Sequence, residues 1–218
     1  AEGKAPGYSI KAPEKLRRLA TEYGIPLDGK DDLKIAAELA YAMQEDYGTR
    51  KSYLTLISRV PEKRRALWAK AGIIPRGIDR ETSEMMHRTH MGVDNDWVNI
   101  LLHGLRNALS DGWGGSMIAT EVSDILFGVP TPVKGTVNMG VLKEDHVNII
   151  VHGHNPVISE TIVNATQSPD LMKMATEKGA KGINLVGVCC TGNELMMRHG
   201  IPMAGNHLMT ELILVTGA

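Results

Sequence analysis

The sequence predicts a helical domain followed by a parallel α/β domain, and two contrasting patterns carry this prediction. Up to about residue 128, apolar residues recur at helical spacing, with glycine or proline between the segments. Further along, short runs rich in valine and isoleucine alternate with helical stretches, as in βαβ units. Residues 129–135 contain two prolines and a glycine, which is typical of a linker. We therefore expect a helical domain over 1–128, a linker over 129–135, and over 136–218 the first half of a Rossmann-like parallel α/β domain, truncated at its end.

The first domain is predicted to contain helices that begin and end at capping or breaking residues. Pro13 suits the first turn of the first helix, and Gly24 suits its end. Asp31 or Asp32 can cap the second helix, which ends near Gly48. The predicted helices cover residues 13–23, 32–47, 61–71, 79–91, 94–109 and 116–126.

Apolar spacing within these helices predicts which faces are buried. The expected core face of the second helix consists of Leu33, Ala36, Ala37, Ala40 and Met43. The fifth helix carries a stripe that we also assign to the core, formed by Trp97, Leu101, Leu105 and Ala108. The basic cluster Lys63–Arg65 is expected to be solvated, and the glycine-rich segment 112–115 is expected to break the helical pattern.

The second domain is predicted to begin with two strands, Val147–Val151 and Ile183–Val188, each buried on both faces. Helices are expected over Val157–Lys178, over Asn193–His199, and from there to the chain end. If the two strands are neighbours in a parallel sheet, their carboxyl ends lie about 5 Å apart.

Candidate metal ligands follow both strands. The first strand leads into His152-Gly153-His154-Asn155-Pro156, and the second into Cys189-Cys190-Thr191-Gly192. Ligands of open parallel sheets collect beyond the carboxyl ends of the strands, so one of these imidazoles and one of these thiolates are expected to converge. Imidazole with thiolate suits zinc, nickel, copper and iron–sulfur centres. A hydrogen-bonding corner for the histidines and apolar packing for the cysteines are the structural alternatives.

The other histidines give weaker evidence of a metal site. His87 and His90 are three residues apart, but a polar helical face explains them as well as a shared metal does. His103, His199 and His207 are assigned to core or surface roles.

Composition excludes several classes of function. The 24 Lys and Arg residues nearly balance 25 Asp and Glu, and the net charge of −1 gives no reason to expect nucleic-acid binding. No apolar run reaches the ~18 residues of a membrane span. The two cysteines are adjacent and suit a reducing cytoplasm better than a disulfide framework. No phosphate loop, dinucleotide fingerprint or serine-hydrolase motif is present.

Longer stretches then make a family resemblance specific. They are VHGHNP at 151–156, GAKGINLVGVCCTGNE at 179–194 and RHGIP at 198–202, with RTHMGVD at 88–94 and ALSDGWGGSM at 108–117 in the helical part. Over essentially its whole length, the sequence resembles the catalytic subunit of anaerobic nickel–iron carbon monoxide dehydrogenase.

The resemblance implies Rossmann-like domains around a buried cluster of nickel, iron and sulfide. It also implies oxidation of CO with water to CO2, two protons and two electrons, which pass through further [4Fe–4S] clusters to a ferredoxin-like acceptor. Matched by motif, His154 is the imidazole ligand and Cys190 the thiolate ligand of one iron, so both are catalytic; Cys189 would bind only in a rearranged cluster. A homodimer, a cytoplasmic location and association with acetyl-CoA synthase are family expectations as well.

The sequence departs from the family in its supply of cysteines. The family uses further cysteines for its clusters, and the resemblance places them outside these 218 residues. We therefore expect the chain to be part of a longer subunit and to be inactive alone. Two alternatives remain: a non-catalytic fragment or relic that cannot hold the cluster, and a zinc hydrolase using His152 and His154. The hydrolase would need a further histidine, an aspartate and an eight-stranded barrel.

Overall fold

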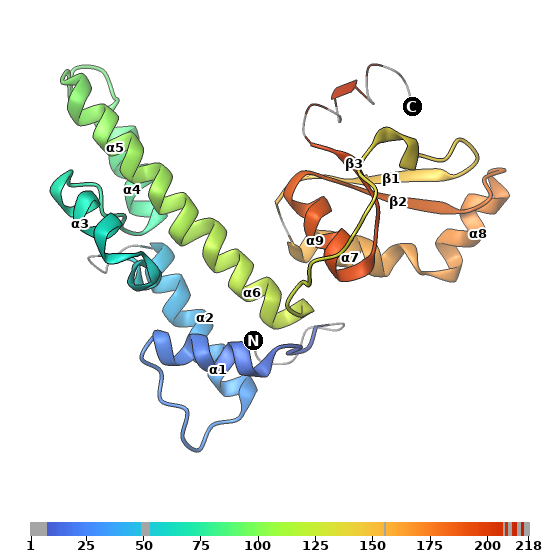
Figure 1. The fold of residues 1–218 in the computed structure, drawn as a ribbon, viewed down its shortest axis with the longest axis horizontal. Helices are drawn as coiled ribbons and strands as arrows, with labels where there is room; N and C mark the ends of the chain where they lie inside the picture. Colours follow the sequence, from blue (N-terminus) through green and yellow to red (C-terminus); the bar gives the residue numbers. More distant parts are fainter. Residues whose placement is uncertain are drawn as a thin grey trace. The chain divides into compact units, whose positions relative to one another are not determined.

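The computed structural model describes residues 8–48, 53–154, 156–206, 208, 211, 212 and 215. These residues form two compact units, a helical unit up to Phe127 and an α/β unit from Gly128 onward (Figure 1). The predicted fold class, helices followed by a parallel α/β arrangement, is confirmed. His207, Asn155 and most of the segment expected to be helical at the chain end lie outside the described residues.

The helical unit follows the predicted order of helices. Its elements are α1 (Pro13–Glu22), α2 (Asp32–Gly48), the 3₁₀ turn η1 (Thr55–Arg59), α3 (Glu62–Lys70), α4 (Ile78–Arg88), α5 (Trp97–Ser110), the π-helical η2 (Asp111–Ser116) and α6 (Met117–Phe127). Pro13 begins α1 as predicted. Asp96 caps α5 by accepting a hydrogen bond from the backbone N–H of Val98, 2.8 Å away.

The main core of this unit lies between α1, α2, η1 and α6. Its fully buried members are Leu16, Leu19, Ala20, Ile35, Leu39, Met43, Leu56 and Ile125. The expected face of α2 is confirmed at Met43 but is wrong at Leu33, which is exposed, while Ile35 and Leu39, which were not expected there, are buried. The three alanines of the predicted face are smaller than Ile and Leu, and burying the larger side chains removes more apolar area from water.

The predicted helix break at residues 112–115 does not occur. A π-helical turn instead joins α5 to α6, and Figure 1 shows the two running on as one long helix. Gly114 explains part of this, since a Cβ at that position would lie 3.2 Å from Leu54 Cδ1. Glycine thus allows η2 to approach Leu54 closely, so its role here is packing and not chain reversal.

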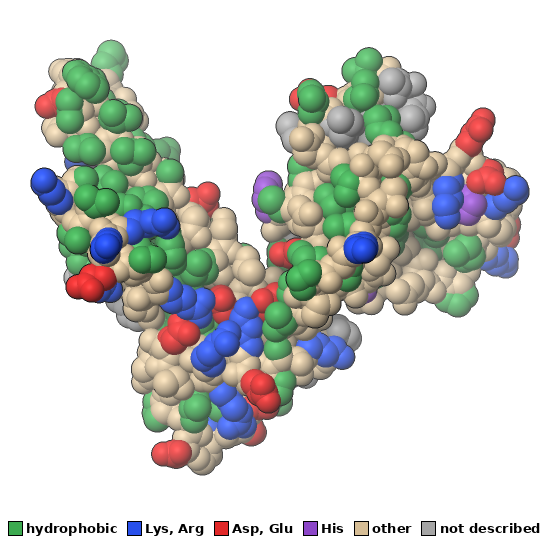
Figure 2. Space-filling model, in the orientation of Figure 1, with side chains coloured by type: hydrophobic (Ala, Val, Ile, Leu, Met, Phe, Trp, Pro, Cys, Tyr) green, Lys and Arg blue, Asp and Glu red, His purple; other side chains and the backbone are tan. Residues whose placement is uncertain are grey.

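The apolar stripe of α5 was assigned to the core, and this was wrong. Trp97 is 72% exposed, Leu101 53% and Leu105 46%, and Ala108 is exposed too. Figure 2 shows hydrophobic side chains gathered on the arm that carries α4 and α5. The buried positions of α5 are polar, namely His103 and Ser110. This helix therefore turns its polar side inward, which apolar spacing alone cannot reveal.

The α/β unit is built on a three-stranded parallel sheet in the order β1-β2-β3. Its elements are the 3₁₀ turn η3 (Met139–Val141), β1 (Val147–Val151), α7 (Pro156–Thr166), α8 (Pro169–Glu177), β2 (Ile183–Val188), α9 (Cys189–His199) and β3 (Met203–Gly205). Both predicted strands have the predicted bounds. Residues 129–135 contain no helix or strand.

Three predictions in this unit need correction. The expected helix over 157–178 is two helices, because Pro169 starts a new first turn at α8. The helix expected from Asn193 begins four residues earlier, at Cys189. A short strand, β3, follows α9 where a helix was expected.

Burial also differs between the two predicted strands. β2 is the central strand and is largely buried, whereas β1 is an edge strand whose Val147 is exposed. Val186, Val188 and Ala204 form one core cluster, and Val151, Val163 and Leu195 form another. Among the described residues, no helix combines the length and the apolar character that crossing a membrane would require.

The contrast between core and exposed leucines yields a prediction. In the 218-residue chain, Leu19→Ala removes a fully buried side chain and should lower the free energy of unfolding by about 2–5 kcal/mol. Leu105→Ala changes an exposed position on α5 and should stay within about 0.5 kcal/mol. Urea denaturation followed by circular dichroism measures both. Equal losses would contradict the assignment of the core.

Candidate metal centre

The carboxyl ends of β1 and β2 lie side by side. The two strands pair in parallel, and Val151 at the end of β1 is the register partner of Gly187. The loop 152–154 and the start of α9 therefore leave the same edge of the sheet. The neighbouring placement of the two strands, on which the predicted site depends, is thus present.

The two cysteines are placed differently by the turn from β2 into α9. Cys189 has a φ of 60°, the only positive φ of a non-glycine residue among the described positions. Such a backbone costs about 1–3 kcal/mol and persists only where its surroundings enforce it. Cys189 is half-buried and packs against Val186 and Val188, whereas Cys190 is exposed. The turn therefore leaves Cys190 exposed and Cys189 packed against the core.

A close contact between the backbones of Gly187 and Gly192 packs the first turn of α9 directly against β2. A Cβ at Gly187 would lie 2.5 Å from Gly192 Cα, and a Cβ at Gly192 would lie 2.7 Å from the carbonyl carbon of Gly187. Any side chain at either position would push helix and strand apart. The small residues near the cysteines thus set how closely α9 approaches the sheet.

A backbone hydrogen bond joins the two ligand-bearing segments. The N–H of Thr191 donates to the carbonyl oxygen of Gly153 over 3.0 Å. Gly153 adjoins both His152 and His154, and Thr191 follows Cys190 directly. Both histidines are exposed, as is Cys190. The structure therefore brings the backbone of the histidine loop against the backbone of the cysteine turn.

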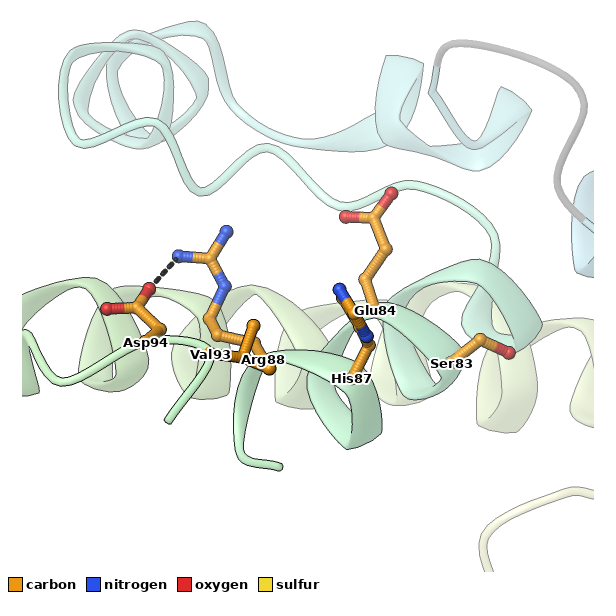
Figure 3. A pocket seen from close by; sticks show the side chains of 6 residues that line it. All are labelled: Ser83, Glu84, His87, Arg88, Val93 and Asp94. Carbon is orange, nitrogen blue, oxygen red and sulfur yellow. Dashed lines mark hydrogen bonds and ion pairs between the residues drawn. The ribbon is translucent and has the colours of Figure 1, made fainter. Parts of the chain in front are cut away.

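The other histidines have separate surroundings. His87 and His90 are exposed at the end of α4, as a polar helical face requires. His87 lines a surface hollow of about 460 Å³. Arg88 and Asp94, drawn with it in Figure 3, form an ion pair of 3.0 Å. His199 bonds to Glu160 in the α/β unit.

One partly buried cluster in the helical unit has the composition of a metal site. Glu81, Glu84 and His103 each offer a ligand atom, and these atoms lie within 4.8 Å of one another. Arginines already occupy the carboxylates: Arg106 Nε donates to Glu81 over 2.8 Å, and Arg76 bonds both glutamates. Two guanidinium groups repel a cation, so we interpret this cluster as a buried charge network and not as a metal centre.

The network shifts the pKa values of its members. Burial raises the pKa of Glu81, but the hydrogen bonds from Arg76 and Arg106 outweigh it and hold the pKa below its ordinary range. Burial, reinforced by the charge of Arg106, lowers the pKa of His103, although Glu81 lies 3.0 Å away. The neutral ring can donate from Nε2 to Glu81. Sequence reasoning missed this network, because no short-range pattern links residues that are 22 positions apart.

The donor types at the sheet edge suit a nickel–iron–sulfide cluster, but the edge supplies too few ligands to hold one. A soft thiolate and an imidazole are ligands that such metals take. The described residues provide these donors at one edge, from the 152–154 loop and the 189–190 turn. A cluster of several metals needs more ligands than this edge supplies.

The fold is that of an α/β protein with a helical unit before the sheet in the sequence, and comparison with known proteins specifies its class. The Prismane/CO dehydrogenase family model matches residues 1–218, so the chain belongs to this family.

Individual relatives agree with this. Carbon monoxide dehydrogenase 1 of Methanosarcina mazei is 58% identical over 217 residues, which cover the whole chain and 35% of that protein. A nickel-free structure of carbon monoxide dehydrogenase from Thermococcus sp. AM4 matches 97% of the chain and 34% of its own, with 53% identity and a TM-score of 0.86. An acetyl-CoA synthase/carbon monoxide dehydrogenase structure has 44% identity and the same TM-score over 100% of this chain and 32% of its own. The chain thus spans about a third of the length of these relatives.

The glycine contact yields a prediction about the site. In the 218-residue chain, Gly192→Ala should destabilise the α/β unit and change the rate at which Cys190 reacts with a thiol reagent, because α9 must move away from β2. Gly104→Ala is the matched control, since its new Cβ would meet only Met85 Cε at 3.9 Å. Thermal unfolding and thiol labelling in the Cys189→Ala background measure the two effects. A Gly192→Ala variant with wild-type stability and a wild-type labelling rate would contradict the close packing of α9 against β2.

The buried histidine yields a pH prediction. His103 has its pKa lowered in the folded state, so below about pH 6.5 the unfolded chain binds more protons and stability falls. A separate loss is expected below about pH 4.5, where carboxylates such as Glu81, with lowered pKa values, become protonated. His103→Gln should remove the first loss and keep the second. Urea midpoints measured from pH 3 to 8 test this. The prediction is refuted if His103→Gln changes with pH near 6 as the wild type does.

Proposed function

We propose that this chain is part of the catalytic subunit of an anaerobic nickel–iron carbon monoxide dehydrogenase, in which His154 and Cys190 bind the same metal of the cluster. The observation that carries the proposal is the hydrogen bond between Thr191 N–H and the Gly153 carbonyl. It ties together the two segments that supply these donors. Membership of the family and the relatives' names support the reaction class.

The cluster, when bound, supplies the redox chemistry that converts CO and water to CO2, two protons and two electrons. The chain's own contribution is to hold donors at a fixed edge of the sheet. Cys190 is the better ligand of the two cysteines because it is exposed, while Cys189 packs into an apolar core cluster. His154 is exposed on the loop that Thr191 holds in place.

The complete enzyme needs ligands that this sequence does not supply. We place the remaining cluster ligands, and the cysteines of further [4Fe–4S] clusters, in parts of the subunit outside the 218 residues. Electrons then leave to a ferredoxin-like acceptor, in a cytoplasmic homodimer. Association with acetyl-CoA synthase is supported by a related structure that contains both enzymes. The zinc hydrolase alternative is not supported by the comparisons, which match the Prismane/CO dehydrogenase family.

Ligand substitutions in the complete subunit test the proposal. His154→Ala and Cys190→Ser should each lower nickel and iron content and reduce CO oxidation by at least about 100-fold, because loss of a direct ligand exceeds the effect of an outer-shell change. Cys189→Ser is the matched control at the adjacent position and should retain most of the metal. Metal analysis and a dye-linked CO-oxidation assay provide the readouts.

The same experiment separates the alternatives. Wild-type metal content in both ligand variants would refute the assignment of His154 and Cys190. A complete subunit that holds no cluster even without substitutions would favour the non-catalytic relic.

A further inference from the structure

A buried carboxylate connects α7 with the far end of α9. Glu160 of α7 is 5% exposed, and its Oε2 lies 2.7 Å from His199 Nε2, near the end of α9. Arg198 Nη1, also from α9, lies 3.9 Å from Glu160 Oε1. Arg198 is itself buried and bonds to Glu194 over 2.8 Å and to the Gly128 carbonyl over 3.0 Å. We call Glu160, Arg198 and His199 the latch.

The latch joins the two helices whose beginnings carry the proposed ligands. α7 starts at Pro156, two residues after His154, and α9 starts at Cys189. Val163 of α7 and Leu195 of α9 are buried in one cluster with Val151 of β1. The apolar contact holds the helices together, and a directional bond beside it further restricts how α9 can turn against α7.

Two directional contacts add to this restraint, one near each end of α9. One is the hydrogen bond from Thr191 to Gly153, and the other is the bond between His199 and Glu160. Along α9 they are eight residues apart, which is about 12 Å at 1.5 Å per residue. Without the bond at His199, this end of α9 keeps the bond from Arg198 to the Gly128 carbonyl but can move further from its place.

From this geometry we propose that Glu160 and His199 are positioning residues of the metal site, which keep Cys190 in register with His154 by fixing α9 against α7. This inference rests on the proposed function. The latch touches neither ligand, and it acts through the direction of the two helices. Its loss therefore leaves both donors in the chain and alters how well they share one metal.

The test uses the complete subunit with Glu160→Ala and Glu160→Gln. In the alanine variant Arg198 keeps its ion pair with Glu194, so no buried charge is left unpaired. Glutamine keeps an oxygen that can accept a hydrogen bond from His199 Nε2, and it should restore part of any loss.

The helical unit offers a matched control. Glu121 is 7% exposed, comparable with Glu160, and it bonds Arg59 over 2.8 Å. In Glu121→Ala, Arg59 keeps Glu22 and Lys15 keeps Asp124. The two alanine variants thus remove similar buried carboxylates, one from the latch and one from the helical unit.

Two readouts are compared, metal retained during titration with a chelator and amide hydrogen exchange at Thr191. Glu160→Ala should weaken metal retention by about 10-fold or more, as outer-shell substitutions do, and Glu160→Gln should weaken it less. The Thr191 amide should exchange faster in Glu160→Ala by about 10-fold, because α9 can then pivot. Glu121→Ala should leave both readouts near wild type even if it lowers the melting temperature.

The outcomes that would contradict the positioning role differ from the one that would contradict the proposed function. Equal loss of metal in Glu160→Ala and Glu121→Ala would show general instability and overturn the positioning role. Wild-type metal retention and exchange in Glu160→Ala would overturn it as well. If His154→Ala and Cys190→Ser retain wild-type metal, the proposed function fails, and the Thr191 exchange rate still decides whether the latch fixes α9.

Discussion

The contact between the backbones of Gly187 and Gly192 is the constraint on which the α/β unit depends. It brings the first turn of α9 so close to β2 that no Cβ fits between them. The chain must then turn from strand to helix with Cys189 in a left-handed conformation, and Cys190 is exposed as a result. Thr191 is placed where its N–H meets the Gly153 carbonyl. Strand pairing, turn, helix and histidine loop thus form one connected arrangement.

The helical unit is organised by a different interaction. Between α4 and α5, Glu81 is fully buried among Arg76, Arg106 and His103. Buried ion pairs contribute less net stability than apolar packing of the same volume, but breaking one is costly because the partner charge is left behind. The network therefore specifies how α4 and α5 pack, while the apolar side of α5 remains exposed.

Sequence reasoning could predict what is local and periodic. The bounds of β1 and β2 followed from continuous apolar runs, and the start of α1 followed from Pro13. The predicted site depended on β1 and β2 being neighbours, as consecutive strands of βαβ units often are, and the structure pairs them. The order of ligand-bearing segments at one sheet edge follows from these two facts.

Features that depend on distant residues could not be predicted. The inward side of α5 is set by contacts with Glu81, which no periodicity within α5 encodes. The π-helical turn at 111–116 depends on a close approach to Leu54, and the latch joins residues 39 positions apart. Which cysteine is exposed is fixed by the close packing of α9 against β2, and the residue types alone left it open.

The proposed function depends above all on a metal shared by His154 and Cys190. The most direct measurement is a crystal structure of the metal-loaded complete subunit, with anomalous diffraction at the iron and nickel edges. We predict one metal within about 2.0–2.3 Å of both an imidazole nitrogen of His154 and Sγ of Cys190, the usual range for such ligands. A cluster that contacts neither residue, or only one of them, would contradict this prediction.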